Sequence, residues 1–441
     1  MSRPKTKWVF IFGVLVVLQL IVLFQSGGST FEVAEAGIDK ADTAWMIVAT
    51  AFVLFMTPGL SFFYGGMVSF KNVISTMLQS FIALGVISLL WYLVGFSLAF
   101  GESYHGLIGN PTTFFAFRNV GLFPHPDFAP SFPFLLFALF QLKFAIITPA
   151  LITGSFAERV KFTSYLIFMC LFSLLIYCPL AHWTWHPEGF LRRWGVLDFA
   201  GGTVVHMSTG FAALAGAYVL GKREMKDHKP ANVPFIILGT GMLWFGWFGF
   251  NAGSALSASG LAVQAFATTN MASASAMITW VMFDALVGRK ISAMGACIGA
   301  VVGLVAITPA AGFVTIGQSV FIGFAAAVVS NLAVYYKQRT TLDDTLDVFP
   351  CHGIGGIVGM ILTAVFAKDV GLVYGQFETF KFHMLALVIV GLFTFIGSYA
   401  IYKVTGLMTR LRVSAEDEKL GLDLSQHSET IHPSGNMEAA A

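Results

Sequence analysis

The sequence predicts an all-α integral membrane protein built around one transmembrane domain. Of its 441 residues, 56% are hydrophobic and only 11% are charged, whereas roughly 25% of the residues of a soluble domain are charged. A soluble chain of this length would also divide into domains joined by polar linkers, but no such tract interrupts residues 41–408. Eleven apolar runs follow one another there, each near the roughly 20 residues that cross a bilayer as a helix.

The expected transmembrane helices are bounded by charged or turn-forming residues. In chain order they cover approximately residues 44–69, 73–100, 132–156, 162–181, 202–220, 233–252, 261–287, 292–309, 311–336, 349–367 and 380–407. Many of the 45 glycines lie inside these runs, where small residues let neighbouring helices approach closely in a membrane.

Residues 1–40 precede the first of these helices. Arg3, Lys5 and Lys7 are followed by an uncharged apolar run over residues 8–24 and by a polar, small-residue stretch, which is the layout of a secretory signal peptide. The run is also nearly long enough for an anchor, so cleavage and retention as a twelfth helix are both open. We therefore expect a lead-in over 1–40, a transmembrane domain over 41–408 and a polar tail over 409–441.

The basic residues indicate how the chain is oriented. With eleven helices assigned, most of the 25 Lys and Arg residues fall in loops on one side, including Arg159, Lys222, Arg223 and Arg410. Cytoplasmic loops carry an excess of Lys and Arg. This bias predicts an inner-membrane protein with its mature N-terminus outside and its C-terminal tail in the cytoplasm.

Composition also excludes several functional classes. The net charge is +2, without the basic face or stripe that a nucleic-acid-binding protein presents. The four cysteines lie in apolar stretches with no C-x-x-C pair, so they resemble small buried hydrophobic residues. We expect no cofactor and no enzymatic activity, because the chain has neither a metal-ligand set nor a nucleophile motif.

A short internal repeat carries the chemically informative residues. Asp198 lies eight residues before His206, and Asp344 lies eight residues before His352. Each histidine is followed four residues later by a glycine and then by an apolar helix. Because five expected helices separate the copies, they enter the membrane from opposite sides, as inverted repeats do in transporters. The sequence thus predicts two inverted five-helix halves plus a C-terminal helix.

The two histidines are the strongest functional candidates. Ionisable residues at bilayer depth are rare, costly and usually functional, and a pseudo-two-fold axis would bring His206 and His352 together near the midplane. Two neutral imidazoles can hydrogen-bond to each other and pass a proton. The alternative is two separate core histidines satisfied by backbone carbonyls. Metal binding is disfavoured, because no carboxylate or thiolate completes a tetrahedral set.

Aspartates stand at the helix entrances that precede both histidines. For Asp198 and Asp347 we favour a structural and electrostatic role, because an Asp there caps the helix and complements its dipole. A direct role as a cation ligand is the alternative. Asp344 is expected to be solvated.

Several motifs together resemble those of the ammonium transporter (Amt/Mep/Rh) superfamily, on its bacterial and archaeal Amt side. They are Phe62-Phe-Tyr-Gly-Gly-Met67, Ser97-Leu-Ala-Phe-Gly101, Gly154-Ser-Phe-Ala-Glu-Arg159, Leu197-Asp-Phe-Ala-Gly-Gly-Thr-Val-Val-His206, Gly246-Trp-Phe-Gly-Phe-Asn-Ala-Gly-Ser254 and Asp347-Val-Phe-Pro-Cys-His352-Gly353. The resemblance extends from Asp42 to the tail. It implies eleven transmembrane helices, a homotrimer and one narrow pore in each subunit.

The resemblance also implies roles for particular residues. Trp185, Phe144 and Ser254 correspond to an outer site that recruits ammonium, and Phe144 and Phe250 to a stacked pair that closes the pore. His206 and His352 correspond to twin histidines that line the pore and relay protons. Ammonium would be deprotonated and cross as ammonia, with or without the proton following. Without the motifs, these Phe residues would be assigned to packing or lipid contact.

Two further features follow from the comparison with the family. Lys143 precedes the expected gate and has no place in a loop; we expect it to pair with a carboxylate or to extend toward the membrane surface, with a direct effect on cation recruitment as the alternative. The polar tail resembles the family's regulatory C-terminus, which implies a PII-type regulatory protein as a partner at the cytoplasmic face.

Three other functional classes are alternatives to a transporter. An ammonium sensor with low flux would bind at the same site, but no output domain is expected after residue 412. An Rh-type channel for ammonia or carbon dioxide shares the fold, and Trp185 at the outer site favours Amt. A membrane enzyme that uses paired histidines is disfavoured by the missing metal set.

Overall fold

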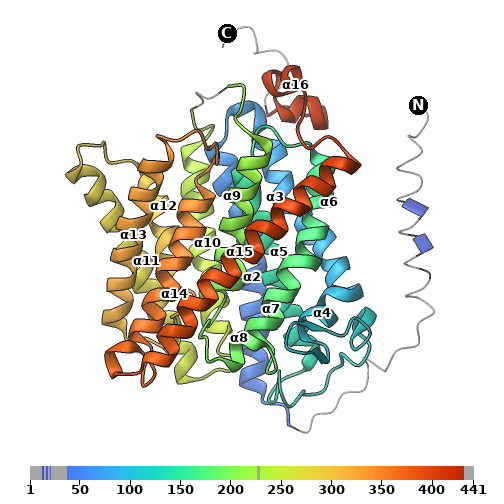
Figure 1. Ribbon diagram of the computed structural model, residues 1–441, viewed down its shortest axis with the longest axis vertical. Helices are drawn as coiled ribbons and strands as arrows, with labels where there is room; N and C mark the ends of the chain where they lie inside the picture. Colours follow the sequence, from blue (N-terminus) through green and yellow to red (C-terminus); the bar gives the residue numbers. More distant parts are fainter. Residues whose placement is uncertain (1–11, 14–15, 18–19, 21–36, 226–228, 432–441) are drawn as a thin grey trace.

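The computed structural model describes residues 12, 13, 16, 17, 20, 37–225 and 229–431, so the expected signal peptide or anchor lies almost wholly outside the described residues. The helices run side by side along a common axis, with α16 at one end and α4 and α8 at the other (Figure 1). They are α2 (Lys40–Met67), α3 (Val73–Leu90), α4 (Phe96–Phe100), α5 (Phe134–Ile152), α6 (Phe162–Phe172), α7 (Cys178–Trp185), α8 (Phe190–Arg193), α9 (Ser208–Leu220), α10 (Val233–Gly253), α11 (Gly260–Leu286), α12 (Ala293–Ile307), α13 (Ile316–Lys337), α14 (Gly355–Phe366), α15 (Phe377–Met408) and α16 (Ala415–Leu420).

Short turns of other helix types extend or join these helices. The 3-10 turns are η1 (Phe70–Asn72), η3 (Phe115–Phe117), η4 (Thr153–Ser155) and η8 (Leu372–Tyr374), and the π-helical turns are η2 (Trp91–Gly95), η5 (Ser173–Tyr177), η6 (Gly202–Met207), η7 (Phe349–Ile354) and η9 (Asp423–His427). A two-residue antiparallel ladder pairs β1 (Ser103–Tyr104) with β2 (Ile108–Gly109) in the loop after α4. π-Helical turns often mark functional sites, and η6 and η7 contain the two candidate histidines.

Nine helical segments of the described chain are long and apolar enough to cross a membrane. The remaining two predicted spans are helices as well. One is α11, with 27 residues that include many Ser, Thr and Asn side chains, and the other is α12, which has only 15 residues. The structure therefore supports a polytopic all-α membrane protein, while the exact number of eleven spans stays a prediction.

One predicted boundary is corrected by a helix cap. The span expected over 311–336 begins at Ile316, because Thr315 and Gln318 form a reciprocal capping box. The Thr315 side chain accepts the backbone N–H of Gln318, and the Gln318 side chain accepts that of Thr315. This arrangement satisfies two donors that the first turn would otherwise leave free, so residues 311–315 form a loop.

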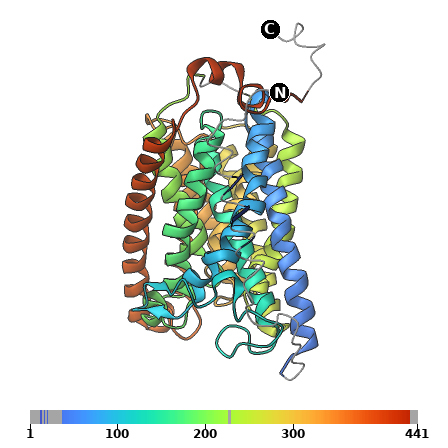
Figure 2. The same ribbon diagram turned by 90° about the vertical axis from the view of Figure 1, so that its right-hand side faces the viewer.

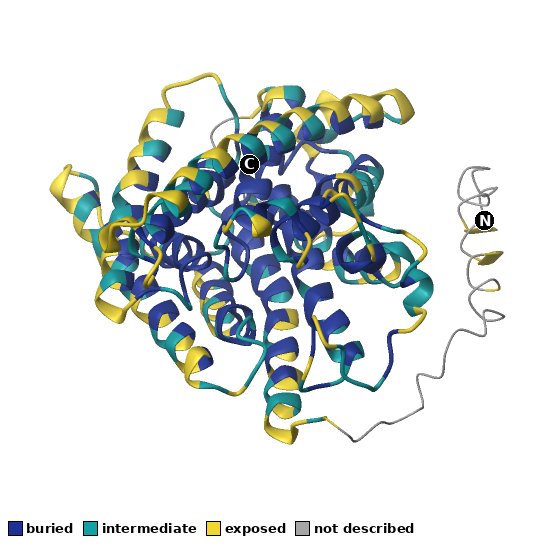
Figure 3. Ribbon diagram, turned by 60° about the horizontal axis from the view of Figure 1, so that its bottom comes forward, coloured by how far each residue is buried: buried dark blue, intermediate teal, exposed yellow. Residues whose placement is uncertain are grey.

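Buried residues gather along the centre of the bundle and exposed ones around its rim (Figure 3). Helix α2 packs lengthwise against α10, with Gly59, Gly239 and Gly246 at points where a Cβ atom would collide with the neighbouring helix. The long helix α15 runs along the outside of the bundle against α9 (Figure 2). The central helices are therefore closely packed along the bundle axis.

Candidate functional site

A vestibule of about 380 Å3 lies at the end of the molecule that carries α8. Its walls include the three side chains predicted to recruit a cation, Trp185, Phe144 and Ser254. They come from the end of α7, the middle of α5 and the residue after α10. The structure thus brings together three residues that are more than 40 positions apart along the chain.

Hydrogen bonds fix the orientation of the vestibule groups. The Trp185 indole N–H donates to the carbonyl of Asp198 at 3.1 Å, and Arg192 donates to the carbonyl of Trp185 at 3.0 Å. Ser254 Oγ donates to the carbonyl of Phe250 at 2.8 Å, which leaves its lone pairs available to an N–H donor. Aromatic faces attract cations by roughly 0.5 to 2 kcal/mol, so the vestibule offers both cation–π attraction and a hydrogen-bond acceptor.

Two phenylalanines, with ring planes tilted 31° to each other, close the inner end of the vestibule. The Phe144 and Phe250 ring centroids are 4.1 Å apart, and Trp185 meets Phe144 edge-on with centroids 5.7 Å apart. Both Phe side chains are completely buried. A hydrated ion cannot pass this contact without movement of the rings, because no polar atom replaces its water there.

The two histidines meet directly behind this contact. His206 Nδ1 and His352 Nδ1 are 3.3 Å apart, and the ring centroids are 5.4 Å apart. The side chains are 1% and 4% exposed. When both rings are neutral, one Nδ1 must donate and the other accept. One ring then presents an accepting Nε2 and the other a donating Nε2, which is the arrangement that a proton relay requires.

The surroundings of the pair are aromatic on one side and apolar on the other. His206 stacks on Trp247 with centroids 5.4 Å apart and lies 6.2 Å from Phe250. His206 Nε2 has no hydrogen-bond partner in the described chain. On the far side, His352 lines a small cavity of about 10 Å3 together with Phe63, about the smallest space that holds one water molecule. The residues that line this cavity include no charged side chain.

Asp198 organises the entrance to the His206 segment. Its Oδ1 accepts the backbone N–H groups of Gly201 and Gly202, and its Oδ2 accepts the N–H and hydroxyl of Thr203. Both carboxylate oxygens are therefore used by the first turn of η6. This is the geometry of a helix cap, formed by a residue that also lines the vestibule.

The second entrance differs from the prediction. Asp344, expected to be solvated, is fully buried, and its Oδ2 accepts the backbone N–H of Phe349 at 2.7 Å. Burial raises the pKa of Asp344 to about 6, and the charge of Lys337 opposes that shift. Asp347, expected at the cap, instead lies 2.6 Å from Lys337 Nζ in an ion pair. The difference arises because Asp347 has a left-handed backbone, with φ at 57°, which turns it away from the helix start.

The glycines that follow the histidines allow the two segments to cross. A Cβ atom on Gly210 would collide with the backbone of Gly353, and one on Gly356 would lie 3.1 Å from the carbonyl of Gly202. The segment η6–α9 therefore crosses η7–α14 with backbone nearly in contact. This close crossing sets the short distance between the histidine rings.

Sequence reasoning missed two polar groups beside the pathway. Gln141 lines the vestibule, is 8% exposed and has a buried Oε1 without a partner in the described chain. Trp247 donates from its indole N–H to Thr308, which fixes the ring that supports His206. Helical spacing was the available signal, since Gln141 precedes Phe144 by three residues and Trp247 precedes Phe250 by three.

Lys143 is placed differently from its neighbours on α5. It does not border the vestibule, and within the described ranges no carboxylate lies within ion-pair distance of its ammonium group. The expected carboxylate pairing is therefore not found.

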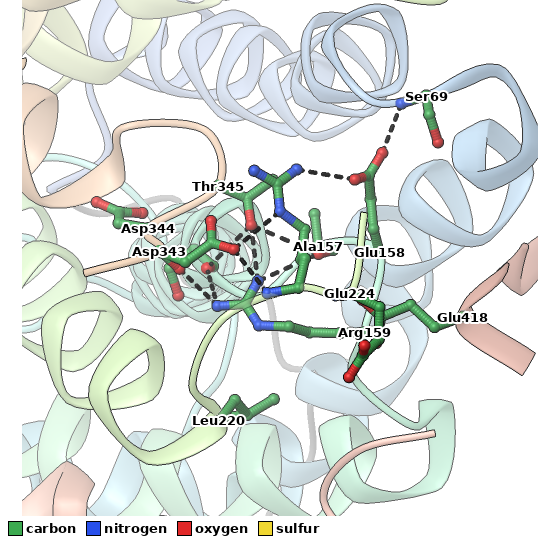
Figure 4. Close-up of polar contacts among 12 residues, drawn as sticks. Ser69, Ala157, Glu158, Arg159, Leu220, Glu224, Asp343, Asp344, Thr345 and Glu418 are labelled. Carbon is green, nitrogen blue, oxygen red and sulfur yellow. Dashed lines mark hydrogen bonds and ion pairs between the residues drawn. The ribbon is translucent and has the colours of Figure 1, made fainter. Parts of the chain in front are cut away.

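At the opposite end, ion pairs join the loops that follow α5, α9 and α13 (Figure 4). Arg223 pairs with Glu158 at 2.8 Å and with Asp343 at 3.0 Å. Arg159 is fully buried and donates to the hydroxyl of Thr345 at 2.7 Å. Burial lowers the pKa of Arg159 to about 10, and Asp343 opposes that shift. This network holds the loop that leads into the His352 segment.

The polar tail is seated on the same end of the bundle. Arg412 pairs with Glu418 at 2.7 Å, and Glu418 also accepts the backbone N–H of Glu224. Farther along, the Asp423 carboxylate accepts the N–H groups of Ile74 and Ser75 at 3.0 and 2.7 Å. The tail thus supplies the cap that α3 lacks, since Asn72 makes no side-chain capping bond.

Comparison with known proteins places this architecture in context. Residues 44–431 match the model of the Ammonium Transporter Family. The chain is 44% identical to an ammonium transporter of Aquifex aeolicus, with 90% of this chain and 95% of that protein covered. Among solved structures, it matches Mep2 of Saccharomyces cerevisiae with a TM-score of 0.81 and 35% identity, covering 86% of this chain and 89% of Mep2.

A second solved structure, of a Sensor Amt Protein, matches with a TM-score of 0.82 and 31% identity over 88% of this chain and 98% of that one. The family match covers the vestibule, the Phe144–Phe250 contact and the histidine pair. The chain belongs to the ammonium transporter family.

Proposed function

We propose that the protein transports ammonium by recruiting the cation in the vestibule, removing a proton and conducting ammonia along the histidine pair. The observation that carries this proposal is the order of groups along the path. The Phe144–Phe250 contact separates the vestibule from His206 and His352, whose Nδ1 atoms are 3.3 Å apart. Cation-attracting groups thus lie outside the barrier, and proton-exchanging groups lie inside it.

This order explains how potassium would be rejected. Ammonium and potassium ions are similar in size, so a path lined with fixed acceptors would admit both. An apolar constriction penalises any ion that must shed its water, and only ammonium can lose its charge by giving up a proton. Whether the proton follows through the histidines decides if transport carries current, and we propose that it does.

The roles of the other predicted residues follow from this mechanism. Trp185, Phe144 and Ser254 recruit the cation, Phe144 and Phe250 form the gate, and Asp198 holds the entrance to the His206 segment by capping it. Asp344 takes the equivalent capping place at the other entrance, so for Asp347 we propose an electrostatic role through Lys337. The protein acts as a carrier or channel and not as an enzyme.

The proposed setting is an inner membrane. The ion-pair network and the tail of residues 409–441 face the cytoplasm, and the vestibule and mature N-terminus face outward, in line with the excess of Lys and Arg on one side. We propose two inverted five-helix halves, a homotrimer and contacts with lipid around the rim. A PII-type protein that acts on the seated tail is the proposed regulator.

Solid-supported membrane electrophysiology on the reconstituted protein tests this function. Pulses of ammonium are expected to give saturable currents, and pulses of potassium at the same ionic strength are expected to give none. A sensor that binds ammonium without transporting it would give only a brief charge displacement, whose size does not increase with the amount of lipid. A channel for neutral gas would give no current. Either result would contradict the proposal.

A further inference from the structure

A third buried histidine, outside the predicted site, connects the two segments that carry His206 and His352. His383 lies in the second turn of α15 and is fully buried. Helix α15 runs beside α14, which directly follows the His352 turn (Figure 1). The His383 ring also makes a hydrogen bond to the loop that leads into Asp198. A helix that belongs to neither segment thus contacts both of them.

Both ring nitrogens of His383 make hydrogen bonds. The backbone N–H of Leu197 donates to Nε2 at 2.8 Å, so the neutral ring carries its proton on Nδ1. Nδ1 donates to the carbonyl of Met360 at 3.0 Å. Only this tautomer satisfies both bonds, because Nε2 cannot accept a hydrogen bond while it carries a proton. His383 therefore joins the residue before Asp198 to the middle of α14.

The bond to Leu197 fixes the backbone on one side of Asp198. On the other side, the N–H of Phe199 donates to the carbonyl of Pro309 at 3.1 Å. Between these two anchors, the Asp198 carboxylate caps the η6 turn that contains His206. The first anchor is a side chain and the second is a backbone carbonyl. A substitution of the imidazole can therefore release the entrance to η6 from one side.

The bond to Met360 fixes the same turn relative to α14. A Cβ atom added at Gly202 would lie 3.1 Å from Met360 Sδ, and one added at Gly356 would lie 3.3 Å from the Cβ atom of His206. Helix α14 therefore packs directly on η6, and it begins immediately after the π-helical turn of His352. The distance between the two rings depends on how η6 lies against α14, which is the contact that His383 joins.

We propose that His383 is a positioning residue for transport, which holds the η6 turn against α14 and thereby sets the 3.3 Å contact between His206 Nδ1 and His352 Nδ1. It acts through Leu197 and Asp198, and it does not border the vestibule or the cavity beside His352. The inference rests on the proposed function, because it concerns the pair along which ammonia is conducted. Loss of the Leu197 bond is expected to lower the maximal transport rate.

Two conservative substitutions separate the two hydrogen bonds of His383. His383→Gln places an amide oxygen near the position of Nε2 and keeps an acceptor for Leu197, whereas His383→Asn reaches only the position of Nδ1 and loses that acceptor. The maximal ammonium current is expected to fall about tenfold in His383→Asn and less than about twofold in His383→Gln. His182→Asn is the matched control and should keep the wild-type current. His182 is also fully buried, uses both ring nitrogens in hydrogen bonds and does not line the vestibule.

A spectroscopic measurement tests the geometry independently of transport. Solid-state NMR of the protein in lipid, with 15N-labelled histidine, reports the hydrogen bond between His206 Nδ1 and His352 Nδ1, which is identified by its absence from His206→Asn/His352→Asn. The signal is expected in the wild type, in His383→Gln and in His182→Asn, and it should be weakened or lost in His383→Asn. Thermal unfolding in detergent is expected to show similar losses of stability for His383→Asn and His182→Asn.

Three results would overturn the positioning role. They are a wild-type current and an unchanged NMR signal in His383→Asn, equal losses of current in His383→Asn and His383→Gln, and a failure of His383→Asn to fold where His182→Asn folds. A wild-type protein without ammonium current would instead contradict the proposed function. The NMR signal of His383→Asn would still decide whether His383 positions the η6 turn.

Discussion

The two segments in which an aspartate lies eight residues before a histidine, Asp198 to His206 and Asp344 to His352, differ in the hydrogen bonds that each aspartate accepts. At the vestibule end, both carboxylate oxygens of Asp198 receive hydrogen bonds from the turn that they cap. At the tail end, Asp344 uses Oδ2 for Phe349, while its Oδ1 is buried without a partner in the described chain. Asp347 and Lys337 form an ion pair beside it.

In both segments the aspartate eight residues before the histidine accepts backbone N–H groups at the start of the following turn. The charged residues around that aspartate differ, because they come from neighbouring elements of the fold. The Asp198 segment borders the vestibule, where the Trp185 indole donates to the carbonyl of Asp198. The Asp344 segment borders the ion-pair network of Arg159 and Arg223, where an additional ion pair helps to hold the loop. The two segments therefore carry the same histidine in different charged surroundings.

The largest expected effect comes from changing the histidine of both copies. The His206→Asp/His352→Asp variant places fixed negative charge behind the gate, so potassium currents are expected to appear in solid-supported membrane recordings. His206→Asn/His352→Asn is the matched control, which lacks both the charge and the titratable nitrogen and is expected to carry neither cation. An ammonium-selective current in the Asp variant would refute deprotonation at this pair.

The glycines of the two copies are expected to differ in their tolerance of a methyl group. Gly210→Ala drives a Cβ atom into the backbone of Gly353, whereas Gly356→Ala meets its closest neighbour, the carbonyl of Gly202, at 3.1 Å. Gly210→Ala should lower the free energy of unfolding by about 3 kcal/mol, because the added methyl group overpacks against backbone. Gly356→Ala has more space and should lower it by about 1 kcal/mol. Thermal unfolding in detergent measures the stability of both variants. Equal losses of stability would show that Gly210 is not packed more tightly at the crossing than Gly356.

The aspartates should differ in the same direction when each is changed to asparagine. Asp198→Asn keeps one accepting oxygen and turns an NH2 group toward the donors of Thr203, so a loss of about 2 kcal/mol is expected. Asp344→Asn can still accept from Phe349 and should cost less than about 1 kcal/mol. Unfolding in detergent at pH 7 tests the order, and the reverse order would contradict the capping assignments.

The smallest expected effect is a pH dependence that belongs to the second copy. The pKa of Asp344 is about 6 against a usual value of 3.8, because burial disfavours the charged form. The folded protein therefore holds this proton more tightly, and the associated stability is complete below pH 3.8 and is lost as the pH rises through 6. When the pH is lowered from 7 to 5, the free energy of unfolding of the wild type should increase by about 1 kcal/mol relative to that of Asp344→Asn. A constant difference would mean that Asp344 does not titrate in this range.

Helix positions were predictable because lipid requires long apolar runs, and the family motifs located Trp185, Phe144, Phe250, His206 and His352. The prediction that Asp344 is solvated was wrong, because the burial of Asp344 depends on tertiary packing. The pairing of Asp347 with Lys337 also depends on tertiary structure, namely a lysine at the end of α13 and one left-handed residue. The start of α13 could have been predicted from Thr315 and Gln318, which have capping-box spacing.

The π-helical turns could not be predicted, because their residues also fit an ordinary helix. Gln141 was overlooked because its spacing from Phe144 indicates only that the two residues share a helix face, and not which cavity that face borders. Its position on the vestibule wall results from packing of α5 against α2 and α3. Such information is tertiary and is absent from any local window of sequence.

The glycine crossing has a consequence for biogenesis. His206 and His352 are 146 residues apart, so a ribosome must synthesise most of the second half before the first histidine acquires its partner. Until then a polar ring and the uncovered face of α9 remain in lipid or with an insertion factor. Contacts of this sequence separation form late. A chain that stops before η7 therefore lacks the segment that covers this face of α9.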